Sequence, residues 1–246
     1  MLTNALTLSD NGKVKFKPNH KNTFGLNFGL PENGGTCPGA TSGLGGCLDV
    51  RDGHKRETCY MAKITQIYKA VGAVLDSNTK KLADKSFPEM VDILVNTFQN
   101  FKDANKPEHW FFRLTYSGDV FSKTFAEALC TACTNFPEIK FWIYTRSFEF
   151  APILVEAPNL AVYLSIDPVN KEKGLKLYRE LRGNYKNIGL AHLSEPTSIE
   201  DIKFVKCPET YGKIANTNER GACAACKLCF TYNNNIALRC IAFKLH

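Results

Sequence analysis

Lys140-Phe141-Trp142-Ile143-Tyr144-Thr145 and Leu160-Ala161-Val162-Tyr163-Leu164-Ser165-Ile166 are the two stretches that decide the fold. Both are short runs of β-branched and aromatic residues, which is typical of buried strands. A short helix is expected between them, at 151–156. A strand, a helix and a second strand at this spacing predict a parallel pair within one sheet.

The same alternation continues in both directions from these stretches. Pro88 opens an amphipathic helix at a position where its missing N–H costs nothing. We expect further helices at 64–75, 125–136 and 171–182, and further strands at 110–116, 187–193, 202–207 and 236–243. The sequence therefore predicts an α/β fold, a complete or partial parallel (β/α) barrel. An open, doubly wound sheet is the alternative.

Length and composition favour one soluble domain. The chain has 246 residues, 44% of them apolar, which is enough for one sizeable core. We divide this single domain, 1–246, into an N-terminal segment (1–63), an α/β core (64–206) and a cysteine-rich C-terminal segment (207–246). No signal peptide or membrane-spanning stretch is recognisable, so we expect a cytoplasmic protein with reduced thiols and no membrane partner. The formal charge of +7 gives slight support to an anionic partner such as nucleic acid.

Polar residues follow several of the expected strands. Because the carboxyl ends of parallel strands meet at one edge of a sheet, we expect these residues to converge there. They are Ser117, Gly118, Asp119, Thr145, Arg146, Asp167, His192, Glu195 and Cys207. Arg146 could clamp an anion or form a structural ion pair with Asp119 or Asp167. His192 and Glu195 could perform acid–base chemistry or form a polar pair.

Four cysteines near the C-terminus have the spacing of a metal site. Cys223, Cys226 and Cys229 are separated by two residues each, and Cys207 precedes them by a loop. Such gaps let successive thiolates curl around one inorganic centre. The tight triple favours a [4Fe-4S] cluster, and four thiolates also suit tetrahedral zinc, the alternative metal.

Three more cysteines, Cys37, Cys47 and Cys59, lie in and after a glycine-rich loop. Cys59 lies where a helix is expected to begin, and a helix N-terminus stabilises thiolate charge. We predict that these three hold a second cluster, so the chain would carry one or two; buried structural thiols are the alternative. Cys130 and Cys133 lie within an expected helix and, like Cys240, are expected to fill the core.

Several motifs resemble the phage gene product 88 family over about residues 26–246. They are Thr36-Cys37-Pro38-Gly39-Ala40, Cys59-Tyr60-Met61-Ala62-Lys63, Ser117-Gly118-Asp119-Val120-Phe121-Ser122, Phe141 to Ser147, Leu160 to Asp167, and Cys226-x-x-Cys229-Phe230. The resemblance implies a phage-encoded protein, located in the host cytoplasm.

The chain is also distantly similar to radical S-adenosylmethionine enzymes, although its cysteines are spaced more widely than the superfamily's C-x-x-x-C-x-x-C. That resemblance implies a radical-SAM-like barrel in which Cys37, Cys47 and Cys59 hold a cluster with one open iron. Tyr60 would be the aromatic residue after the last cysteine, and Ser117, Gly118 and Asp119 the turn that binds S-adenosylmethionine. The substrate would then be an unknown small molecule, peptide or nucleic acid.

A non-catalytic role is the alternative reading of the same residues. In this hypothesis an iron-sulfur or zinc centre replaces core burial, and the basic surface binds nucleic acid or a host protein. A third possibility is that the seven cysteines serve one cluster, with spare thiols.

Overall fold

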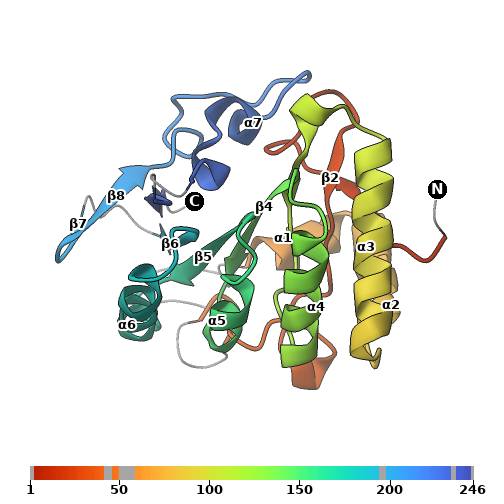
Figure 1. Ribbon diagram of the computed structural model, residues 1–246, viewed down its shortest axis with the longest axis horizontal. Coiled ribbons are helices and arrows are strands. Elements are labelled where there is room, and N and C mark those ends of the chain that lie inside the picture. Colours follow the sequence, from red (N-terminus) through yellow and green to blue (C-terminus); the bar gives the residue numbers. More distant parts are fainter. Residues whose placement is uncertain (1–2, 42–45, 50–58, 194–197, 234–236, 245–246) are drawn as a thin grey trace.

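A nine-stranded, mostly parallel sheet organises the chain (Figure 1). The computed structural model describes residues 3–41, 46–49, 59–193, 198–233 and 237–244. The strand order is β1-β2-β3-β4-β5-β6-β9-β8-β7, with antiparallel pairing only at the two ends, β1 with β2 and β7 with β8. The strands are β1 Ser9–Asp10, β2 Lys21–Thr23, β3 Phe111–Arg113, β4 Lys140–Thr145, β5 Leu160–Ile166, β6 Ile188–Leu193, β7 Ser198–Ile199, β8 Ile202–Lys206 and β9 Cys240–Phe243.

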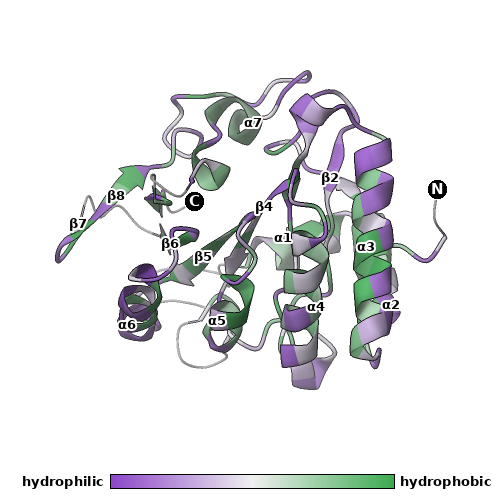
Figure 2. Ribbon diagram, in the orientation of Figure 1, coloured by the Kyte–Doolittle hydropathy of each residue, from purple (hydrophilic) through white to green (hydrophobic). Residues whose placement is uncertain are grey.

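The longer helices pack on one face of the sheet, and the short helix that carries Cys223 lies against the other. The helices are α1 Tyr60–Ile67, α2 Lys69–Leu82, α3 Phe87–Asp103, α4 Lys123–Thr134, α5 Ala151–Leu154, α6 Lys171–Arg182 and α7 Ala222–Cys226. Short 3-10 turns add η1 Pro31–Asn33, η2 Pro107–His109, η3 Phe148–Phe150 and η4 Leu228–Phe230. None of the described helices combines the length and apolarity needed to cross a bilayer. The hydropathy colouring shows α6 with a strongly polar outer side (Figure 2).

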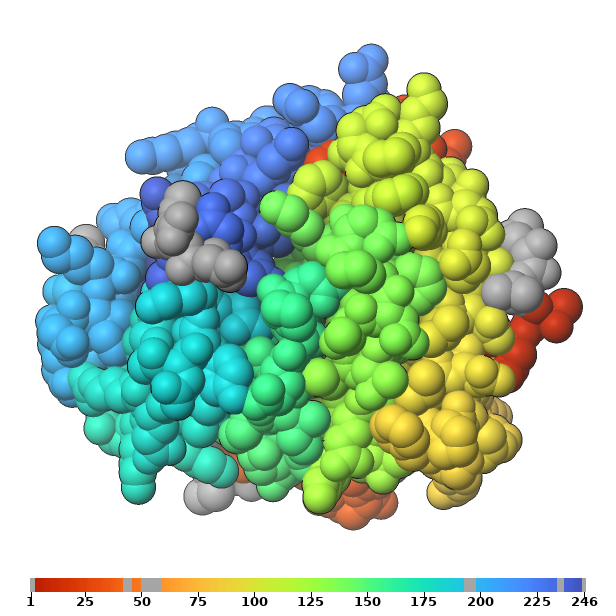
Figure 3. Space-filling model, in the orientation of Figure 1, coloured from red at the N-terminus to blue at the C-terminus, as the bar shows by residue number. Residues whose placement is uncertain are grey.

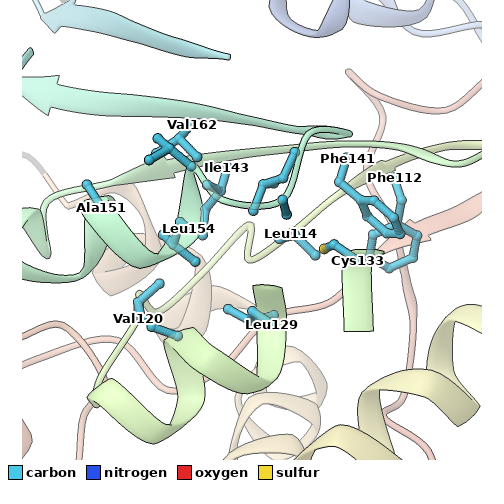
Figure 4. Packing of buried hydrophobic residues seen from close by; sticks show 14 of the residues in the cluster. Phe112, Leu114, Val120, Leu129, Cys133, Phe141, Ile143, Ala151, Leu154 and Val162 are labelled. Carbon is cyan, nitrogen blue, oxygen red and sulfur yellow. The ribbon is translucent and has the colours of Figure 1, made fainter. Parts of the chain in front are cut away.

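Side-chain alternation in the central strands gives the sheet two different faces. Phe112, Phe141 and Val162 point toward α4 and α5, and pack with Leu129 and Leu154 in the main core (Figure 4). Cys133 lies fully buried in this core, Cys130 packs against it from the same helix, and Cys240 is buried in β9. The expectation that these three cysteines fill the core is confirmed.

The opposite face is covered by irregular chain rather than by the long helices. Trp142, Tyr163 and Ile241 project from this face and pack against Val14 and Phe230. Parallel β8 and β9 need a crossover connection, and the cysteine-rich segment 207–239 supplies it. In the space-filling view these residues, in blue, lie directly against the central part of the chain (Figure 3).

The expected complete barrel is wrong, because the sheet is open. In the described residues, β1 and β7 each pair with one neighbour only, and both are two-residue strands that end the sheet with antiparallel pairing. The doubly wound alternative differs as well, since helices α2–α6 contribute to the core on one face. The strand order from β2 to β6 simply follows the chain.

One expected helix, 64–75, is divided in the structure. The backbone leaves helical geometry at Tyr68 (φ −113°, ψ 85°), so α1 ends at Ile67 and α2 begins at Lys69. The break changes the phase of the apolar stripe. Ile67 and Tyr68 at the break are exposed, and α2 buries Leu75, Asn78 and Leu82.

Candidate metal centres

The crossover between β8 and β9 brings the four C-terminal cysteines together. Cys207 follows β8, and its N–H donates to the Ala242 carbonyl of β9 at 2.9 Å. Cys223 and Cys226 lie in α7, which begins against the N-terminal segment: Cys223 N–H donates to the Lys13 carbonyl at 2.8 Å. Lys227 then adopts a left-handed conformation (φ 60°) that reverses the chain toward Cys229. Sequence-distant thiols are thereby placed on one face of the sheet.

All four of these thiols line a single pocket. Most of its remaining walls are apolar, formed by Pro208, Ala222, Leu228, Phe230 and Ile241, with Glu209 at its side. None of the ten cysteines of the chain forms a disulfide, so the thiols of this group are not joined to one another. Four soft sulfur donors around a mostly apolar pocket match the ligand chemistry of an iron-sulfur cluster or zinc.

The electrostatics of this pocket oppose a bare thiolate. Burial raises the pKa of the Cys223 thiol to about 11, an effect increased by Cys207, Glu209 and Cys226 and opposed by Arg113. Burial likewise raises the pKa of Cys229, with Cys223 as the next cause. Deprotonated thiols at this place therefore need a compensating cation, which a metal supplies.

The four sulfur atoms of the C-terminal group do not have the arrangement of metal ligands. Across the described ranges, no group of three or more His, Cys, Asp or Glu side chains has an arrangement that could hold a metal ion. Ligation by the C-terminal group thus requires these side chains to close inward from their observed positions.

The three N-terminal cysteines also lie close to one another, beyond the carboxyl ends of the strands. Cys59 precedes α1 as its N-cap residue, and its N–H donates to the Cys47 carbonyl at 2.8 Å. Burial raises the pKa of Cys37, with smaller effects from Asp119 and from the thiols of Cys47 and Cys59. Burial also raises the pKa of Cys47 to about 11, although Arg146 opposes this shift. The fold thus places these three thiols among ionic side chains.

The turn formed by Ser117, Gly118 and Asp119 fastens the loop that carries Cys37. The Asp119 carboxylate accepts hydrogen bonds from Thr145 Oγ1 (2.6 Å) and from the N–H groups of Val120 (2.8 Å), Arg146 (2.7 Å) and Ser147 (3.2 Å). Ser117 Oγ donates to the Leu26 carbonyl at 2.8 Å.

Gly118 has φ +73°, and a Cβ there would lie 2.4 Å from Thr36 Oγ1, so only glycine fits this turn. These contacts give the turn a structural role. Its predicted role in binding S-adenosylmethionine stays a prediction.

Other predicted residues at this edge are placed as follows. Arg146 forms an ion pair with the fully buried Asp167, one of the two interpretations of Arg146. His192 is buried, and burial lowers its pKa from 6.5 while Asp167 opposes the shift. The Tyr60 hydroxyl reaches inward and donates to the Tyr116 carbonyl, while its ring is half exposed. Glu195 lies outside the described residues.

Sequence reasoning missed Tyr144. Alternation along β4 puts Tyr144 on the same face as Trp142, and its hydroxyl donates to Cys229 Sγ at 2.9 Å. The signal was present in the sequence, because a tyrosine in a strand next to apolar residues needs a polar partner for its hydroxyl.

Comparisons with known proteins agree on one family. The profile of the family described as Gene product 88 matches residues 3–232. The "Gene 88 protein" of Mycobacterium phage L5 is 32% identical over 218 residues, which cover 85% of this chain and 84% of that protein. The "Gene 88 protein" of Mycobacterium phage D29 is 31% identical over 220 residues, with the same coverage. No solved structure matches the chain.

Proposed function

This chain belongs to the gene product 88 family of phage proteins, and we propose that it is an iron-sulfur protein with two cysteine-ligated centres. The observation that carries the proposal is the pocket lined by Cys207, Cys223, Cys226 and Cys229, all free thiols. In a mostly apolar pocket such thiols are either protonated or bound to metal.

Each group of cysteines would hold its own centre. Cys207, Cys223, Cys226 and Cys229 would supply four ligands, and Cys37, Cys47 and Cys59 would supply three. A bound iron-sulfur cluster supplies one-electron chemistry at such a site. The chain itself contributes a pocket mostly lined by apolar groups around the first group and, around the second, ionic and hydrogen-bonding groups at the strand ends. Zinc is the alternative metal for the four-thiol group.

The three-thiol group leads to a finer proposal of radical-SAM-like catalysis. A cluster with three protein ligands keeps one iron open, as binding of S-adenosylmethionine would require. The Cys37 thiol lies close to Asp119 of the proposed cofactor turn. The Asp119 carboxylate already accepts four hydrogen bonds. The amino group of the cofactor would therefore have to bind to backbone carbonyl groups of the turn.

A non-catalytic module is the second candidate, favoured by the formal charge of +7. In this role the metal centres stabilise the fold, and the basic surface binds nucleic acid or a host protein in the host cytoplasm. Binding to single- or double-stranded DNA should then weaken steeply with added salt, because phosphate contacts release counterions. Salt-independent binding to DNA, or none, would remove the nucleic-acid form of this candidate.

Metal and acid-labile sulfide analysis of anaerobically purified protein tests the main proposal. We expect iron and sulfide in equal amounts, with one or two clusters per chain, and an electron paramagnetic resonance signal on reduction. Zinc without sulfide would favour the alternative metal. Fully folded protein that contains neither metal would refute the proposal. Absence of S-adenosylmethionine binding by cluster-loaded protein would discard the radical-SAM branch alone.

A further inference from the structure

Tyr144 and Arg113 form a row with Cys229 on the irregularly covered face of the sheet. The Tyr144 hydroxyl donates to Cys229 Sγ at 2.9 Å. The Arg113 guanidinium carbon lies 5.3 Å from the centre of the Tyr144 ring, a cation–π distance. Phe243 packs edge-on against Tyr144 at 5.7 Å, and Tyr163 stacks on it at 5.1 Å. The tyrosine is thus held in one orientation, with its hydroxyl aimed at the sulfur.

The hydroxyl of Tyr144 is a hydrogen-bond donor to the sulfur of Cys229. A hydrogen bond to a cluster sulfur stabilises the more negative, reduced state.

Arg113 has no carboxylate partner among the residues that the structure describes. Among the described residues, no ion pair involves Arg113, and its Nε is buried without a hydrogen-bond partner. Its positive charge is close enough to Cys223 to act on that thiol. Arg113 is partly buried, and a cluster held by four thiolates, which carries negative charge, would provide a counter-ion for its guanidinium.

We propose that Tyr144 and Arg113 raise the reduction potential of the C-terminal centre, which makes this centre an electron acceptor and not a purely structural staple. The inference rests on the proposed iron-sulfur function. Tyr144 and Arg113 are positioning residues in this scheme, because neither is a ligand. Both act in the same direction: one hydrogen bond and one positive charge each favour the added electron.

A redox titration with dithionite, followed by electron paramagnetic resonance, tests the inference. Signals that disappear in Cys226→Ala protein are assigned to the C-terminal centre. We expect Tyr144→Phe to shift the midpoint potential of that centre to a more negative value at unchanged iron content. Arg113→Gln should shift it in the same direction, and Arg113→Lys less, because the charge remains. The N-terminal centre serves as an internal reference for Tyr144→Phe.

Tyr163→Phe is the matched control. The change removes the same atom from the adjacent stacked ring, and the Tyr163 hydroxyl has no hydrogen-bond partner within the described parts of the chain. The midpoint potential of the C-terminal centre in Tyr163→Phe should equal that in the unmodified protein. An unchanged potential in Tyr144→Phe, or an equal shift in Tyr163→Phe, would overturn the inference and leave the iron-sulfur function standing. Protein without iron would overturn both.

Discussion

The two groups of cysteines occupy opposite kinds of environment. The C-terminal group lies under the crossover chain on one face of the sheet, among Phe230, Leu228 and Ile241. The N-terminal group lies beyond the strand ends, among the charged groups of Asp119 and Arg146. The first location is continuous with a core cluster, whereas the second combines thiols with hydrogen-bonding groups. We infer that the first centre supports the fold and stores an electron, and that the second is the place where other molecules bind.

Removal of one proposed ligand from each group should give the largest difference in stability between the two regions. We expect Cys226→Ala to lower the folded yield and to decrease the free energy of unfolding by at least about 3 kcal/mol, because structural metal binding contributes on the order of 10 kcal/mol to small domains. Cys47→Ala should also lower the yield, but less, since its group is not part of a core cluster. Iron content and chemical denaturation measure both effects.

Cys130→Ala is the control for these two variants. Cys130 is a partly buried thiol of α4 that packs against the main core, remote from both proposed centres in the fold. Iron content should stay complete in this variant. Normal yield with full iron in both ligand variants would contradict the assignment of the two groups.

Asp119→Ala should disturb the N-terminal group selectively. The change removes the acceptor of four hydrogen bonds and leaves buried donors without partners, at a cost of about 3 kcal/mol. Iron at the N-terminal centre should fall while the C-terminal centre stays loaded. Thermal denaturation and separate quantification of the two resonance signals test this, and an equal loss at both centres would refute the distinction.

The sequence predicted the scaffold better than the site. The strands 140–145 and 160–166 and the helix 171–182 appear with the same boundaries, because short continuous apolar runs are typical of strands buried on both faces and a helix of this length fits between them and the next strand. Openness of the sheet was not predictable, since it depends on how short edge strands such as β1 and β7 terminate the pairing.

The C-terminal group of cysteines was predicted as a metal site from its spacing, and the N-terminal group from its glycine-rich loop and the helix that begins at Cys59, yet the hydrogen bond from Tyr144 to Cys229 was not foreseen. It joins residues 85 positions apart and depends on the path of the crossover.

Protonation of His20 should destabilise the segment around Phe16, which packs in the same core cluster as the C-terminal cysteines. His20 is buried and accepts a hydrogen bond from the Phe16 N–H, and Phe16 stacks on Phe111 of the same core cluster. Burial, with His109 and Lys17, lowers the pKa of His20 from 6.5 to about 4. The unfolded chain therefore binds a proton below pH 6.5 that the folded chain refuses until about pH 4.

Stability should accordingly fall as the pH decreases from about 6.5 to 4, by about 3 kcal/mol from this group. His20→Gln should flatten the curve over that interval, even if it lowers stability at neutral pH. Denaturant titrations at several pH values measure the effect. Thiol labelling of metal-free protein should reach Cys223 before Cys37 in mild acid; the reverse order would mean that the Phe16 segment does not protect the C-terminal group.

Ser86→Ala provides the smallest effect and the most stringent test of the comparison. Ser86 caps α3 through a reciprocal capping box, in which its N–H donates to Glu89 Oε2 at 2.9 Å and its hydroxyl, which the change removes, donates to the same oxygen at 2.6 Å. The loss of this cap should cost about 1 kcal/mol. Because α3 packs on the helical face of the sheet, the change lowers global stability without touching either group of cysteines. Iron should remain complete at both centres. If iron instead declined in proportion to stability in this variant, the losses in the ligand variants would reflect general unfolding, and the two environments would no longer explain them.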